Sequence, residues 1–110
     1  MTIDPNTPGE PTSPGLNGHE MVDVHMDAVG TVTDVLFDDM SFTPKWAIVR
    51  TGFFWGERYV PLEHAYVDES GRLVVAFDKA AIKRAPRARG QHVISPDTAR
   101  ELREYYNVAA

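Results

Sequence analysis

Beyond residue 20 the apolar residues come in short groups that turn-forming residues separate, and the groups are rich in Val and aromatic side chains. Short runs of this kind are typical of β-strands. We expect six strands, at residues 21–26, 31–37, 45–51, 57–61, 65–68 and 73–77. Because no helix interrupts the series and the chain is short, the sequence predicts an all-β fold in which a six-stranded antiparallel sheet curls into a small barrel.

Alternation along the strands predicts which side chains fill the barrel. Residues two apart in a strand point to the same face. The expected interior consists of Trp46, Ile48, Val60, Leu62, Leu73, Val75 and Phe77. Ala47, Val49, Val74 and Ala76 fall on the opposite faces, which are apolar as well. These outer faces therefore need a cover from elsewhere in the chain.

A short helix near the C-terminus can provide that cover. Ser95 suits the N-cap position, Pro96 suits the first helical position, and Asn107 can end the helix in a left-handed conformation. Apolar and aromatic residues recur between them at helical spacing: Ala99, Leu102, Tyr105 and Tyr106. The sequence predicts a helix over about 96–106.

The first eighteen residues have a different composition from the rest. Pro recurs at every third position from residue 5 to residue 14, among several Gly residues. Such a segment favours coil or polyproline II and cannot fill a core. We expect a disordered tail at 1–18 and a single domain at 19–110. The N-terminus has neither a basic segment nor an apolar segment of a signal peptide, and no apolar run is long enough to cross a membrane, so we expect a cytoplasmic protein without membrane insertion.

The charges are unevenly distributed. The formal net charge is −5, yet residues 79–92 hold five Lys or Arg and no acidic residue. A broad nucleic-acid surface needs more cations than this on one face, so we expect no nucleic-acid partner. The alternatives for the basic segment are a solvated connection and a contact with an acidic protein or with a second copy of the chain, as in a homodimer. Its five cations are Lys79, Lys83, Arg84, Arg87 and Arg89.

Three consecutive aromatic residues, Phe53, Phe54 and Trp55, lie between Gly52 and Gly56. In a hairpin they cannot all point into one core, so at least one is expected to face solvent or a partner. Exposed aromatic side chains are enriched as anchors of protein interfaces. The competing interpretation is a loop that folds back onto the barrel.

Catalytic or metal chemistry has little support. The chain has no cysteine, no phosphate-binding Gly-rich loop and no nucleophile elbow, and its four His residues are far apart in sequence. We therefore expect no enzyme, no cofactor and no bound metal. Asp34, Asp38 and Asp39 form the densest group of carboxylates. This group is either a polar strand end followed by a turn, or a site for a ligand, a cation or a proton.

Several stretches together carry a family resemblance. They are Gly30 to Asp38, Trp46 to Gly52, Val60-Pro61-Leu62, Val75 to Pro86, and an ending with Ile94-Ser95-Pro96, Leu102, Tyr105 and Tyr106. In this order they resemble the PRC-barrel domain, in particular its single-domain bacterial members, over roughly residues 20–107.

The resemblance implies a six-stranded small β-barrel with a C-terminal helix. Known relatives are the cytoplasmic part of the photosynthetic reaction centre H subunit and the C-terminal domain of a ribosome maturation factor, which binds a ribosomal protein. We expect neither specific role to transfer, because no membrane helix and no second domain accompany the barrel here. The expected function is a non-catalytic adaptor that contacts another protein or a second copy. The alternative is a small-ligand, cation or proton-handling module like the H subunit.

Overall fold

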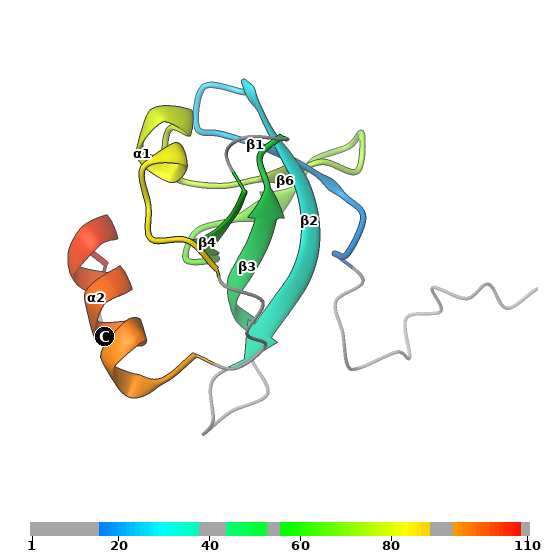
Figure 1. The fold of residues 1–110 in the computed structure, drawn as a ribbon. Coiled ribbons are helices and arrows are strands. Elements are labelled where there is room, and N and C mark those ends of the chain that lie inside the picture. Colours follow the sequence, from blue (N-terminus) through cyan, green and yellow to red (C-terminus); the bar gives the residue numbers. More distant parts are fainter. Residues whose placement is uncertain (1–15, 38–43, 53–55, 89–93, 109–110) are drawn as a thin grey trace, which may run out of the picture.

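The computed structural model describes residues 16–37, 44–52, 56–88 and 94–108 (Figure 1). Its strands form one six-stranded sheet in the order β4-β3-β2-β1-β6-β5. Two helices, α1 and α2, follow the strands in sequence. The elements are β1 (Glu20–Val22), β2 (Ala28–Phe37), β3 (Pro44–Arg50), β4 (Glu57–Pro61), β5 (Tyr66–Val67), β6 (Leu73–Val74), α1 (Lys79–Lys83) and α2 (Pro96–Tyr106).

The mostly-β fold, the number of strands and the C-terminal helix are confirmed, but two details of the predicted sheet are wrong. The sheet is mixed, because β1 pairs with β6 in parallel while the other four pairings are antiparallel. The sheet is also not closed into a barrel, since β4 and β5 stand at the two ends of its hydrogen-bonded order. The antiparallel prediction assumed that strands pair with their neighbours in sequence, whereas β6 reaches back to β1.

The sheet is nevertheless strongly curled. The strands at its two ends, β4 and β5, are separated in sequence by four residues only. Five peptide units reach at most roughly 18 Å, whereas six strands in a flat sheet place the end strands about 24 Å apart. The connection from Pro61 to Tyr66 therefore requires a coiled sheet whose ends approach each other without forming a ladder.

Both faces of β3 are covered, as the apolar pattern required. Trp46 and Ile48 on one face and Ala47 and Val49 on the other are all buried. Most of the predicted interior is buried too, while Leu62 and Phe77 are partly buried against the core. Of the residues assigned to the outer faces, Val74 is buried and Ala76 is exposed.

The C-terminal helix has the predicted bounds and caps. The Ser95 hydroxyl accepts a hydrogen bond from the backbone N–H of Thr98, and Asn107 is left-handed with φ 59°. Figure 1 shows α2 beyond β4, on the side away from β2. The helix is attached there by buried Leu102 and by Tyr106, whose hydroxyl donates to the carbonyl of Tyr59 at 2.6 Å.

The folded region begins earlier than residue 19. Leu16 is buried and belongs to the core cluster, and the Gly18 N–H donates to the carbonyl of Val32 at 2.7 Å. His19 adds a contact between its Nδ1 and the carbonyl oxygen of Gly71, at 2.6 Å. Residues 16–18 are thus attached to the sheet, and the remainder of the predicted tail lies outside the described residues.

Candidate functional site

A buried carboxylate organises the turn between β1 and β2. Asp23, 1% exposed, accepts hydrogen bonds from the backbone N–H groups of His25 at 2.8 Å, Asp27 at 2.9 Å and Lys79 at 2.8 Å. Burial alone raises the pKa of the Asp23 carboxyl, but these three donors and the nearby His25 stabilise the carboxylate and lower the pKa below 3.8. The strand predicted at 21–26 is therefore wrong over residues 23–26, which form a turn.

The same carboxylate joins the turn to α1. Lys79 is the first residue of this helix, and its backbone N–H has no acceptor inside the helix. The Asp23 carboxylate supplies that acceptor. Asp78 caps the helix by accepting from the N–H of Ala81 at 2.9 Å, and the N–H of Val24 donates to the carbonyl of Phe77 at 3.2 Å. The turn and the helix therefore form one fixed unit, which Figure 1 shows at one end of the molecule.

This unit exposes two apolar side chains. Val24 is 50% exposed and Met26 is 43% exposed. Met26 also has φ 69°, a left-handed conformation that residues other than Gly, Asn and Asp rarely adopt. The hydrogen bonds of Asp23 on both sides of it hold this conformation, so the turn presents Val24 and Met26 in a fixed arrangement.

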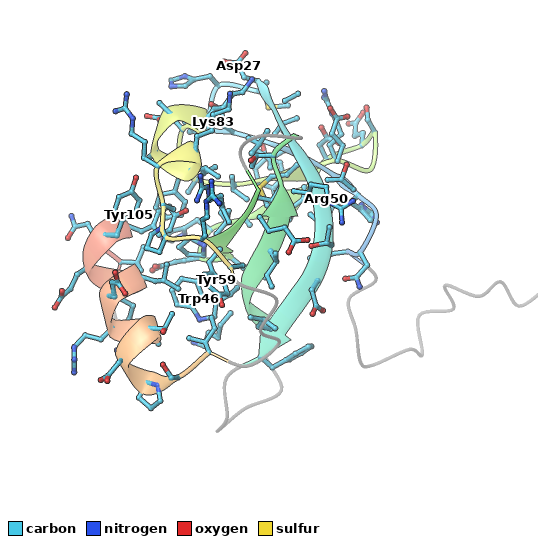
Figure 2. All side chains as sticks on the ribbon, in the orientation of Figure 1. Asp27, Trp46, Arg50, Tyr59, Lys83 and Tyr105 are labelled. Carbon is cyan, nitrogen blue, oxygen red and sulfur yellow. The ribbon has the colours of Figure 1, made fainter. Side chains whose placement is uncertain are left out.

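Cations of the predicted basic segment lie next to these apolar groups. Lys79 and Lys83 begin and end α1, the exposed Arg84 follows as its C-cap, and Figure 2 shows Lys83 on the helix and Asp27 on the turn at the same end of the molecule. The turn and the helix also carry the exposed carboxylates of Asp27 and Asp78, of which Asp78 accepts from the N–H of Ala81. We call this surface the turn–helix face; it consists of Val24, His25, Met26, Lys79, Lys83 and Arg84.

Two further cations form a separate cluster at the outer edge of β4. Arg87 makes an isolated antiparallel bridge with Arg58, and the N–H of Ala88 donates to the carbonyl of Glu57 at 2.9 Å. The Arg58 side chain is 7% exposed. Burial and the charge of Arg87 both lower the pKa of the Arg58 guanidinium. The structure thus divides the predicted basic segment between two places.

Sequence reasoning missed Arg58, although the pattern contained a signal. Arg58 is two residues before Val60, which the alternation already placed inside. Both are buried on β4, but Val60 pairs with Ala47 and Arg58 pairs with Val49, so both lie on the face that the alternation assigned to the outside. The predicted placement of Val60 on the face of Trp46 is therefore wrong, and the spacing showed only that Arg58 shares a face with Val60.

The remaining predicted site residues are not brought together by the described structure. Asp34 lies in β2, where its Oδ1 accepts from the N–H of Val35 at 2.8 Å. Residues 38 and 39, the aromatic group at 53–55 and Arg89 lie outside the described residues. The interpretations of the carboxylate group and of the aromatic group stay predictions.

An open groove of about 910 Å³ lies where β1, β2, β3 and β4 come together. At its centre β2 and β3 approach so closely that a Cβ on Gly30 would lie 1.9 Å from the carbonyl oxygen of Arg50. Arg50 and Glu57 both line the groove and are 3.7 Å apart between Nη2 and Oε2. Arg50 compensates Glu57, but Glu20 adds a second carboxylate to the lining, so the groove is negatively charged overall.

Among the residues that the structure describes, no three His, Asp or Glu side chains converge in a way that could hold a metal ion. Neither helix within the described ranges combines the length and the apolar character that crossing a membrane requires.

The PRC-barrel domain model matches residues 16–82, which include all six strands and all of α1 except its last residue, Lys83. The chain belongs to the PRC-barrel domain family. The match begins at Leu16, where the structure also places the first core residue. In this PRC-barrel domain, Arg87 and α2 lie beyond the matched stretch, while Asp23 and Arg58 lie within it. A search of the curated proteins found no match.

Proposed function

We propose that this PRC-barrel domain is a non-catalytic module that binds another protein through its turn–helix face. The observation that supports the proposal is the fixed exposure of Val24 and Met26 beside the cations of α1. A partner that binds such a face loses little conformational entropy on the module's side, because the Asp23 hydrogen bonds have already ordered the turn.

The composition of the face favours a particular partner chemistry. Apolar side chains provide burial, whereas Lys79, Lys83 and Arg84 provide attraction for carboxylates and set the orientation. We infer a protein segment with acidic residues around an apolar anchor. Residues 1–15 of the chain itself contain the acidic residues Asp4 and Glu10 and no Lys or Arg, so a second copy is one partner of this chemistry.

The test is a double substitution of the apolar pair, Val24→Ser with Met26→Ser, followed by quantitative affinity purification from the native host and light scattering of the pure protein. We expect the bound protein, or the self-association, to be lost while the melting temperature stays within a few degrees. Tyr66→Ser with Val67→Ser is the matched control, because these β5 residues are equally exposed, at 57% and 47%.

Two results contradict the proposal. One is a partner that binds the Val24/Met26 variant as well as it binds the parent protein. The other is a partner lost only from the Tyr66/Val67 variant, which would place the contact at β5 instead.

A further inference from the structure

The bridge between β4 and the segment after α1 places two arginines opposite each other. Residues that face each other across an antiparallel bridge project their side chains to the same side, and like charges in this position repel. Arg58 and Arg87 occupy such a pair. The arrangement costs free energy unless something neutralises it.

Burial adds to the free-energy cost of the positive charge on Arg58. Its Nη1 donates to the carbonyl of Ala85 at 3.2 Å, but its Nε is buried without a hydrogen-bond partner. A buried charge usually has a counter-charge, because the loss of hydration is otherwise uncompensated. Within the described residues no carboxylate lies at ion-pair distance from either Arg58 or Arg87.

Two tyrosines near Arg58 are neutral. The hydroxyl of Tyr106 donates to the Tyr59 carbonyl at 2.6 Å, and that of Tyr105 donates to the Ala81 carbonyl at 2.5 Å. Neither tyrosine therefore supplies a negative charge. Gly56 borders the Arg87 guanidinium, since a Cβ added to Gly56 would lie in van der Waals contact with the Arg87 Cζ and Nε atoms, at 3.9 Å. Arg87 itself is exposed to solvent.

We propose that Arg58 and Arg87 form a binding site for a phosphate-type oxyanion. A guanidinium presents its N–H donors in a planar fork that matches the oxygens of phosphate. A phosphate group carries about −1.5 to −2 charges at pH 7, which balances two arginines. Arg87 provides the accessible half of the site, and Arg58 provides a fixed positive charge behind it.

The test is a titration of the whole chain with inorganic phosphate, with sodium chloride added to keep the ionic strength constant. We expect a saturable rise in melting temperature beyond that in chloride, and shifts of the backbone amide resonances of residues 56–58 and 87. Arg87→Gln should weaken phosphate binding at least tenfold. Arg100→Gln is the matched control, since Arg100 is an exposed arginine on α2 whose guanidinium pairs with Asp97 at 3.2 Å, and it should bind phosphate like the parent.

A parallel titration with phenyl phosphate distinguishes the source of the group. Tighter binding of phenyl phosphate than of inorganic phosphate identifies a phosphomonoester as the ligand, and the reverse order identifies the free ion. Equal melting temperatures in phosphate and chloride overturn the proposal, and so does an Arg87→Gln protein that responds like the parent. No partner protein enters these measurements, so their outcome is independent of the proposed docking function.

Discussion

Asp23 and Arg58 are both almost fully buried and charged, yet their surroundings differ. The Asp23 carboxylate accepts three backbone N–H hydrogen bonds from two separate elements. The Arg58 guanidinium donates to one carbonyl, faces a second arginine and leaves its Nε without a partner. Nearly all buried polar groups in proteins are satisfied, so an exception requires an explanation.

The difference indicates two roles for buried charge in one small domain. A satisfied carboxylate stabilises the fold, because it orders the turn and the start of α1 together. An unsatisfied guanidinium destabilises the isolated fold and is explained by something that the protein binds. The turn–helix face depends on the first residue, and the oxyanion site depends on the second.

The largest effect on the free energy of unfolding is expected from Asp23→Ala. The substitution leaves three backbone N–H groups without their acceptor, and we expect a loss of about 3 kcal/mol in the free energy of unfolding. Urea denaturation followed by circular dichroism measures it. Asp27→Ala, at an exposed position in the same turn, is the control and should change stability by less than about 0.5 kcal/mol. Equal effects of both substitutions would show that the Asp23 hydrogen bonds do not stabilise the turn.

Low pH should remove part of the stabilisation that the ionised Asp23 carboxylate provides. The pKa of Asp23 is lowered in the folded protein, so the folded state binds fewer protons than the unfolded state at acidic pH. The stabilisation is complete above the ordinary pKa of about 4 and is lost as pH falls through the lower folded value. Unfolding measured from pH 7 to pH 2 should therefore show a weaker acid dependence for Asp23→Asn than for the parent. Identical acid dependence of the two proteins would contradict the role of the ionised Asp23.

The sequence was sufficient for the local features of this fold. Short apolar runs located all six strands with boundary errors of at most four residues, and Ser95, Pro96 and Asn107 gave the bounds of α2, because caps are set by neighbouring residues. The start of β2 at Ala28 was missed, since it depends on Asp23 closing the turn through Lys79, which is 56 positions away in sequence.

Long-range pairing was the part that the sequence could not specify. The parallel pairing of β1 with β6 joins Met21 to Leu73, and no local pattern distinguishes it from an antiparallel pairing. The candidate site residues show the same difference between what is local in sequence and what depends on long-range pairing. A count of charges located the basic segment, but the pairing of Arg87 with Arg58 emerges only when the chain returns to β4.

The smallest effect on the free energy of unfolding is expected from Arg58→Met, and this substitution should stabilise the protein. Methionine keeps much of the length of the side chain and removes the buried charge, its unpaired Nε and the repulsion by Arg87. We expect a gain of about 1 kcal/mol in the free energy of unfolding in chloride buffer, because buried ionic groups can be replaced by apolar ones of similar volume without loss. Arg72→Met is the control, since Arg72 has an ion pair with Asp68 at 2.9 Å and should lose stability. A loss of several kcal/mol for Arg58→Met would instead make Arg58 a structural residue, anchored by the Ala85 carbonyl, and would remove its distinction from Asp23.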